Sequence, residues 1–326
     1  MEQHTRRGYL IAILSALILA WTGVFISYVS VNFQLPVLIL AFWRNLFVVV
    51  TLLPILLIFR PHLLKVGRGN FRFLLIFSLM LVLFNSFWTT SVAFTGAAVA
   101  TVLVYSSGAF TAILDAIINK EKIDIYKALA IVLSLTGCVL VSEAMNAEVW
   151  AVNALGIVTG LLSGLMYAVY TLFGRSAAER GINTWTTILY TFLFAAIVFL
   201  ALNLLSLDFL PGTAGNPAEM LWMGSAWQGW LALFLLAAGP TLLGYGTYNM
   251  ALRDLPSSIV NLIVTSEPVF TMIIAFLLLG ERMNSFQILG SVLILGGVVL
   301  MRLDLGGEHL QAKGRKEYVT KRDIRG

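Results

Sequence analysis

The sequence contains a single cysteine, Cys138, and it lies inside an apolar run. One cysteine excludes an intrachain disulfide and a thiolate metal cluster. Histidine is also scarce, because His4, His62 and His309 are the only ones, and they lie outside the apolar runs and far apart in the sequence. Without a cluster of histidines and acids in the apolar runs, a metal-hydrolase site is not expected. We therefore expect no metal and no cofactor.

Charge is scarce too. Charged residues make up 11% and apolar residues 59% of the 326 residues, and the mean hydropathy is +0.91. A soluble globular protein has about 25% charged and about 45–50% apolar residues. The composition therefore predicts an integral membrane protein. Ten spans of ~20 residues would use about 200 positions, which leaves no room for a separate soluble domain.

Apolar runs with the length of membrane-spanning helices follow one another along the whole chain. The runs cover residues 8–31, 36–59, 71–93, 97–118, 125–143, 153–174, 184–206, 228–251, 257–279 and 285–302. The first run is longer than a signal-peptide core of about 7–15 residues, so we expect it to remain as the first helix. The predicted fold is an all-α polytopic membrane protein with ten transmembrane helices.

Lysine and arginine are missing from alternate connections between these runs. The connections around residues 32–35, 94–96, 143–152 and 207–227 contain neither, whereas the connections between them carry at least one Lys or Arg each. Arg282, in the last connection, breaks the alternation. Short loops rich in Lys and Arg remain in the cytoplasm. Both termini are therefore predicted to be cytoplasmic: residues 1–7 as a short N-terminus and residues 303–326 as a basic tail. We expect the chain to reside in the cell (inner) membrane.

The two halves of the chain repeat each other. The sequence Gly-Ala-Phe-Thr-Ala-Ile at 108–113 aligns with Pro-Val-Phe-Thr-Met-Ile at 268–273, a shift of 160 positions. We predict two repeats, residues 8–146 and 153–302. Five spans per repeat is an odd number, so the second copy must cross the membrane in the opposite sense to the first. Folds with inverted repeats bind their substrates near the bilayer midplane, between the halves.

Several short motifs in this repeat carry a family resemblance. They are Glu267–Phe270 and Leu279–Arg282 in the second half and Lys120–Lys122 in the first, with weaker matches from Gly8 to Gly23 and from Gly156 to Tyr170. The chain resembles the EamA-like ten-helix members of the drug/metabolite transporter superfamily over about residues 8–302. The resemblance implies their fold and a transport role, with export as the direction, and names no substrate. This chain departs from the family at Ser107–Gly108, where such proteins often have proline.

Glu267 is the acid that most needs an explanation. It lies about ten residues into its span, or ~15 Å deep, directly before Pro268. An acid at that depth faces protein or a water-filled cavity, where it can take and lose a proton. The alternative is architectural: Pro268 frees the carbonyl of Val264, and a protonated Glu267 satisfies local polar groups.

A polar stripe in the fourth span accompanies Glu267. Ser107, Thr111 and Asp115 recur every four residues and so share one helix face. The repeat aligns Ser107 with Glu267 and Thr111 with Thr271, so we expect the two stripes to face each other. Asp115, near the cytoplasmic end, is interpreted as a gate or solvated residue, and it is the second candidate for coupling.

Arg44 lies about eight residues into the second span, or ~12 Å from its end. A buried cation can face the cavity and hold a substrate carboxylate or Glu267. It can equally be structural and bond to free carbonyls of neighbouring helices. The sequence leaves these alternatives open.

Rings and amides cluster on single faces of several spans, which is typical of a mostly apolar pocket with a few placed polar groups. Together with Arg44 they give the candidate substrate-binding residues Trp21, Arg44, Asn85, Trp88, Tyr105, Tyr170, Tyr245, Tyr248 and Asn249. A glycine stripe at Gly156, Gly160 and Gly164 predicts close helix contact, within the bundle or in a homodimer.

These features predict a secondary transporter of a small metabolite, such as an amino acid, that exports by alternating access and exchanges protons through Glu267. The rival within transport is an uptake or facilitated-diffusion carrier in which Glu267 is structural. A membrane enzyme would need a catalytic cluster or a large aqueous loop, and a receptor would need more loop surface for its ligand. We expect a small-molecule substrate and the lipid bilayer as partners and no nucleic acid, and both a monomer and a homodimer stay open.

Overall fold

The computed structural model describes residues 2–118, 120, 123–141, 154–205, 212–279 and 284–300, and the regular elements of these residues are all helices. The motif residues Glu121, Lys122 and 280–282 and the tail 303–326 lie outside the described residues.

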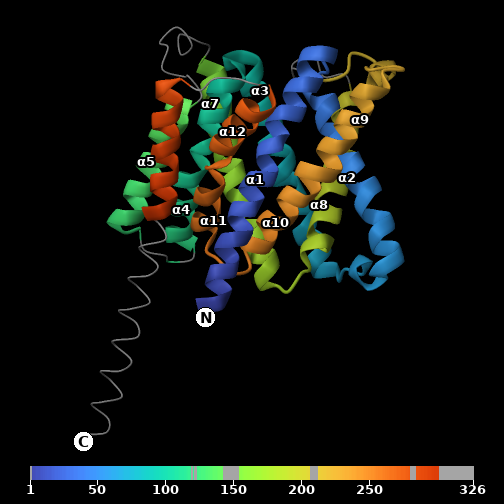
Figure 1. The fold of residues 1–326 in the computed structure, drawn as a ribbon. Helices are drawn as coiled ribbons and strands as arrows, with labels where there is room; N and C mark the ends of the chain where they lie inside the picture. Colours follow the sequence, from blue (N-terminus) through green and yellow to red (C-terminus); the bar gives the residue numbers. More distant parts are fainter. Residues whose placement is uncertain are drawn as a thin grey trace, which may run out of the picture.

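Most of the helices are long and apolar (Figure 1). They are α1 (Glu2–Phe33), α2 (Val37–Phe59), α3 (Arg68–Tyr105), α4 (Ser107–Ile118), α5 (Ile125–Val141), α7 (Ala154–Glu179), α8 (Thr184–Leu204), α9 (Trp227–Leu236), α10 (Leu242–Ala251), α11 (Ser257–Val264), α12 (Glu267–Leu279) and a last helix, Ser285–Leu300. Short turns add η1 (Pro61–Leu64), η2 (Pro217–Leu221) and the π-helical η3 (Ala237–Thr241), which joins α9 to α10.

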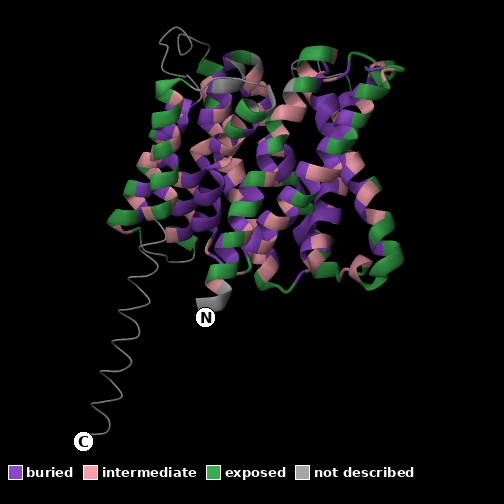
Figure 2. Ribbon diagram, viewed as in Figure 1, coloured by how far each residue is buried: buried purple, intermediate pink, exposed green. Residues whose placement is uncertain are grey.

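Eight segments of the described chain are long and apolar enough to cross a membrane, and the two helices Ile125–Val141 and Ser285–Leu300 are shorter. Within the described residues the ten apolar runs predicted from the sequence are helical, except at the run ends Pro36 and Leu205 and at turns inside two runs, at Ser106 and at Thr265–Ser266. Large apolar side chains such as Leu10, Leu57 and Ile58 are exposed on the outside of the bundle, where Figure 2 shows green patches around a purple interior. An apolar exterior suits hydrocarbon rather than water. The prediction of an all-α polytopic membrane protein is confirmed.

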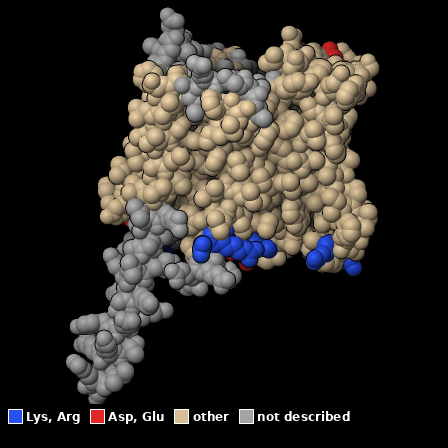
Figure 3. Space-filling view, viewed as in Figure 1, with Lys and Arg blue, Asp and Glu red and all other residues tan. Residues whose placement is uncertain are grey.

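Basic residues gather at one end of the bundle, below a wide uncharged band (Figure 3). Apart from Arg44, the Lys and Arg residues of the described chain lie at or beyond the starts of α1, α3 and α5 and the ends of α2, α7 and α10. They are Arg6, Arg7, Arg60, Lys65, Arg68, Arg72, Lys120, Lys127, Arg175, Arg180 and Arg253. We call this side the basic end.

The long element α3 contains two antiparallel spans. A Cβ added at Gly160 of α7 would lie 2.7 Å from Ser91 Oγ and 2.8 Å from Leu103 Cβ. In a straight helix, twelve residues would separate these two side chains by ~18 Å. The chain of α3 therefore reverses its direction between Ser91 and Leu103, as the predicted boundary between runs 71–93 and 97–118 requires.

Two spans, one in each half of the chain, are interrupted at matching places. A turn at Ser106 separates α3 from α4, and a turn at Thr265 and Ser266 separates α11 from α12. Ser106 Oγ donates to the carbonyl of Leu103 at 2.5 Å, and Ser266 Oγ donates to the carbonyl of Ile263 at 2.7 Å. Both partners of the second bond lie 160 positions after those of the first. The first half thus has its break without a proline, because a serine hydroxyl bonds the carbonyl at the interruption.

Glycines bring the helices into close contact. Cβ atoms added at Gly156, Gly160 or Gly164 would collide with residues of α3 and of the Ser106 turn, so this stripe is covered within the chain. Gly137 of α5 and Gly290 of the last helix meet in the same way, since each added Cβ would lie 2.6 Å from the other glycine's carbonyl oxygen. Such small faces let helices approach where larger side chains would hold them apart.

Candidate functional site

A cavity of about 660 Å³ lies inside the bundle. Residues of both halves line it, from α1, α2, α3 and α5 in the first half and from α7, η3, α10, α11 and α12 in the second. Most of the lining is apolar, and its polar, cysteine or ring-bearing members are Thr22, Ser30, Arg44, Phe84, Asn85, Trp88, Thr101, Tyr105, Cys138, Tyr167, Thr241, Tyr245, Asn261, Thr265, Glu267 and Thr271. Small-molecule sites have this character and volumes of about 300–1,000 Å³.

The cavity extends toward the end of the bundle that lies opposite the basic end. Ser30 and Val31 near the end of α1, and Val37 at the start of α2, belong to its lining. The basic residues of these helices lie at their other ends, at Arg6, Arg7 and Arg60.

Glu267 lies in the cavity wall as the first residue of α12. The phenol of Tyr105, the last residue of α3, is its neighbour. The break before Glu267 is bridged by other groups, since Thr265 Oγ1 donates to the carbonyl of Leu262 at 2.6 Å and Ser266 bonds Ile263. The interruption of the helix is therefore held by hydroxyl groups, and the carboxyl group of Glu267 is available to the cavity.

Arg44 lies in the wall contributed by α2 and is only 8% exposed. Its Nη2 donates to Asn85 Oδ1 at 2.7 Å, and Asn85 Nδ2 donates to the carbonyl of Leu81 at 2.8 Å. The Arg44 Nε atom is buried without a hydrogen-bond partner. Within the described chain the guanidinium is thus bonded to a side-chain amide, rather than to helix carbonyls as the structural interpretation of the sequence required.

The structure divides the predicted substrate-binding residues into two groups. Arg44, Asn85, Trp88, Tyr105 and Tyr245 line the cavity together with Glu267, whereas Trp21, Tyr170, Tyr248 and Asn249 are not part of its lining.

The residues outside the lining have other surroundings. Tyr170 and Tyr248 are fully buried, and Tyr248 hydrogen-bonds Thr171 at 2.6 Å. Asn249 Nδ2 donates to the Tyr170 hydroxyl at 3.3 Å. These three residues pack between α7 and α10 behind the cavity wall. Trp21 has an exposed fraction of 37% and belongs to the outer surface of α1.

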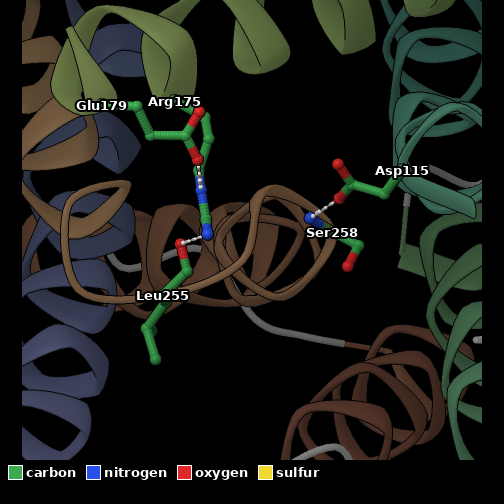
Figure 4. A network of polar contacts seen from close by, with 5 residues as sticks. All are labelled: Asp115, Arg175, Glu179, Leu255 and Ser258. Atoms are coloured by element: carbon green, nitrogen blue, oxygen red, sulfur yellow. Dashed lines mark hydrogen bonds and ion pairs between the residues drawn. The ribbon is translucent and has the colours of Figure 1, made fainter. Parts of the chain in front are cut away.

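Asp115 is buried, which corrects its interpretation as a solvated residue. Its exposed fraction is 0%, and its Oδ2 accepts a hydrogen bond from the backbone N–H of Ser258 at 2.8 Å. Ser258 is in the first turn of α11, where unpaired N–H groups favour an anion. Figure 4 shows the carboxylate directed at this helix start.

A second contact in Figure 4 ties the same segment to α7. Arg175 Nη1 donates to the carbonyl of Leu255 at 2.8 Å, and Arg175 Nε donates to Glu179 Oε1 at 2.9 Å. The connection between α10 and α11 is therefore held from two sides, by α4 through Asp115 and by α7 through Arg175. Both contacts lie at the basic end.

The prediction that the two polar stripes face each other is wrong. Ser107 Oγ donates to Asn261 Oδ1 at 3.1 Å, so α4 faces α11 rather than α12. Thr271 Oγ1 donates to the carbonyl of Ala20 on α1 at 3.1 Å. The stripes differ in their partners because both spans are interrupted, and the segments before and after each break have separate neighbours.

Asn261 is a cavity residue that the sequence reasoning missed. It lies in the wall contributed by α11, is 1% exposed, and donates through Nδ2 to Thr171 Oγ1 at 3.2 Å. Ser107, Asn261, Thr171 and Tyr248 thus form one buried chain of hydrogen bonds across four helices. An amide in an apolar run six residues before Glu267 is a signal of the same kind as Asn85, and it could have been found.

A polytopic helical bundle around an interior cavity lined by both halves has the architecture of a membrane transporter for small molecules. The EamA-like transporter family matches residues 6–143 and 154–303, so the chain belongs to that family. It is therefore a multi-pass membrane transporter of the drug/metabolite transporter superfamily.

Relatives agree with this class. An uncharacterized transporter of Archaeoglobus fulgidus is 25% identical over 291 residues, which cover 88% of this chain and 95% of that protein. The uncharacterized transporter YyaM of Bacillus subtilis is 26% identical over 220 residues, 66% of this chain and 68% of its own. One protein of known crystal structure superimposes on this chain with a TM-score of 0.73 and is 14% identical in sequence. The match covers 91% of this chain and 97% of that protein, and at this identity it shows a shared fold alone.

Proposed function

We propose that the chain is a secondary transporter that moves a small metabolite by alternating access, with the cavity of about 660 Å³ as its substrate site. The observation that carries this proposal is that both halves of the chain line the cavity, so that a movement of one half against the other changes the side from which the cavity is reached.

Ten transmembrane helices in two inverted repeats, residues 8–146 and 153–302, form the mechanical basis of the proposal. The paired breaks at Ser106 and Ser266, with their equivalent hydroxyl bonds, support it. The packing supports it as well, because α1 lies against α9 and α10 in the way that α7 lies against α3.

The basic end is assigned to the cytoplasm, with both termini on that side, because short connections rich in Lys and Arg remain there. The cavity then opens outward, and the contacts of Asp115 and Arg175 close the cytoplasmic side. The conformation is accordingly outward-facing, the state in which an exporter releases its substrate.

Glu267 is proposed as the residue that exchanges protons for substrate. Its carboxyl group lies at the cavity, and the hydroxyls of Thr265 and Ser266 already bond carbonyls at the helix break. Glu267 contacts the Tyr105 phenol and is not needed to bond these two carbonyls, and an acid so placed at this depth supports coupling over a purely structural role. In such an exchange, protons that enter from outside through the cavity drive the substrate in the opposite direction, out of the cell.

A cavity-filling variant tests the proposed site. Gly23 lines the cavity, and the nearest atom to an added Cβ, Thr271 Cγ2, is 3.5 Å away, so Gly23→Phe folds and occupies the cavity. Gly296 has open space around its Cβ position and lies on the last helix, so Gly296→Phe is the matched control.

The measurement is transport into proteoliposomes across a panel of amino acids, nucleobases, organic acids and organic cations. We expect Gly23→Phe to lower the rate of every transported compound at least tenfold, because a filled site cannot bind, and Gly296→Phe to retain the wild-type rate. Wild-type rates in both variants would remove the cavity from the transport path.

A further inference from the structure

Arg44 presents a charge that the described chain leaves uncompensated. Ion pairs among the described residues are Arg7–Asp254 and Arg175–Glu179, and neither includes Arg44. Arg44 is buried, with an exposed fraction of 8%, and its Nε has no hydrogen-bond acceptor. A buried guanidinium without a counter-charge is costly, since burial removes its water without replacing it by an anion.

Asn85 fixes the orientation of this charge. Its Nδ2 is bonded to the carbonyl of Leu81, one turn earlier in α3, so its Oδ1 must face Arg44 Nη2. The amide thus holds one corner of the guanidinium and adds no negative charge. A neutral holder leaves the cation available to an incoming anion, whereas an aspartate at this position would neutralise it.

The surrounding cavity limits the kind of anion. Arg44 is the only Lys or Arg among the described residues that line the cavity, and Glu267 belongs to the same lining. A single cation balances a single negative charge, and an ionised Glu267 disfavours a second one. The wall near the outer opening is mainly apolar or aromatic, for example at Val92, Val102 and Trp88, and its other polar groups are uncharged hydroxyls such as Ser30 and Thr101.

From these observations we propose that Arg44, positioned by Asn85, is an anion subsite that binds the carboxylate of a substrate with an apolar body. The proposal rests on the cavity being the substrate site, and it names the chemistry that this site selects. Asn85 acts as a positioning residue, through its bond to Arg44.

The test is equilibrium binding to the purified full chain in nanodiscs of phosphatidylcholine. The probes are three compounds with the same body: 3-phenylpropionate, 3-phenylpropanol and 3-phenylpropylamine. We expect the carboxylate to bind about tenfold more tightly than the alcohol, since charge-assisted hydrogen bonds contribute on that order, and the amine to bind no better than the alcohol.

Three variants locate the preference. Arg44→Gln should abolish it, and Asn85→Asp should abolish it as well, because the new carboxylate occupies the guanidinium. Arg60→Gln, which removes an exposed cation at the end of the same helix, should retain it. Removal of a buried unpaired charge does not by itself unfold a protein, and cooperative melting of each variant in the same discs verifies that it is folded.

Equal binding of carboxylate and alcohol by the wild type would overturn the inference, and so would a carboxylate preference that survives in Arg44→Gln. Loss of the preference when the discs contain phosphatidylglycerol would assign Arg44 to a lipid headgroup and overturn it too. Binding is measured without a gradient or turnover, so it is independent of the transport assay. The carboxylate preference can be absent while Gly23→Phe still supports the transport site, and it can be present while Gly23→Phe transports normally.

Discussion

Arg44 and Glu267 belong to the lining of one cavity, yet no ion pair joins them in the described chain. Two opposite charges that neutralised each other would offer little to a ligand or a proton. In the proposed mechanism their separation leaves each available for its own task, with the cation toward an anion and the acid toward proton exchange. At the residue scale, the proposed function thus depends on two charged groups that do not neutralise each other.

The substitution Glu267→Gln tests the coupling role. The amide has a similar shape and keeps Pro268 and the helix break, but it does not titrate. We expect accumulation driven by a pH gradient to fall at least tenfold, while substrate-for-substrate exchange continues. The measurement is accumulation in proteoliposomes with and without an imposed pH gradient, at equal amounts of folded protein.

Glu219→Gln serves as the control, because Glu219 lies in an exposed turn and is not part of the cavity lining. It should accumulate substrate like the wild type. Gradient-driven accumulation by Glu267→Gln at the wild-type level would instead support the carrier without proton coupling and make Glu267 structural.

The sequence predicted the depth of these residues better than their neighbours. Counting along an apolar run placed Arg44 and Glu267 deep in their spans, and helical spacing correctly placed Asn85 and Trp88 on one cavity face. The same spacing grouped Tyr245 with Tyr248, although only Tyr245 lines the cavity. Spacing defines a face, and it cannot tell which part of that face a neighbouring helix covers, as α7 covers Tyr248 through Thr171.

At the scale of elements, the contacts at the connection between α10 and α11 are the ones proposed to close the cytoplasmic side of the cavity. Asp115 bonds the first turn of α11, and Arg175 bonds the carbonyl of Leu255 just before it. These contacts join three helices that are distant in sequence. In the proposed mechanism an inward-facing state requires that they separate, so they would stabilise the outward-facing state relative to it.

Asp115→Ala should therefore shift the protein toward the inward-facing state. A hydrogen bond to a charged acceptor contributes about 1.5–3 kcal/mol, which corresponds to a shift of tenfold or more in the ratio of the two states. The measurement is labelling from outside of a cysteine placed at Val92, which lines the cavity, in a Cys138→Ala background. We expect a lower labelling rate in Asp115→Ala.

Asp115→Asn is the matched variant, because its amide oxygen can still accept the bond from Ser258. It should restore most of the labelling rate. Equal rates in the Ala, Asn and unchanged proteins would show that this contact does not bias the two states. The sequence placed Asp115 near the cytoplasmic end but could not show that α11 begins against it, because that contact joins residues 143 positions apart.

At the scale of the whole molecule, the alignment of the two halves predicted more than a helix count. It paired Gly108 with Pro268, and the structure has a break on the N-terminal side of each. The mechanism of the first break was not predictable from the missing proline, since a serine side chain closes that turn. The spans of α3 were predicted from composition, whereas their packing on α7 depends on small residues distributed along α7.

The orientation of the molecule is tested by single cysteines in the Cys138→Ala background. Gln34 lies in the connection between α1 and α2, and Gly215 lies in the exposed turn before η2, both at the end opposite the basic residues. Gly67 lies between η1 and α3 at the basic end, and an added Cβ there meets no atom within 4 Å. Gly314 belongs to the basic tail, outside the described residues. Gln34, Gly67 and Gly215 lie outside the helices, so cysteines there disturb no packed helix.

An impermeant thiol reagent added to intact cells should label cysteines at 34 and 215 and leave those at 67 and 314 unlabelled until the membrane is opened. The physical reason is that Lys and Arg beside a span oppose its transfer across the membrane, so the basic end stays in the cytoplasm. Labelling after permeabilisation controls for reactivity, because every site must then react. Labelling of position 67 before permeabilisation would show that the predicted orientation in the membrane is reversed. The conformation would then be inward-facing, and the side from which Glu267 takes up its proton would change as well.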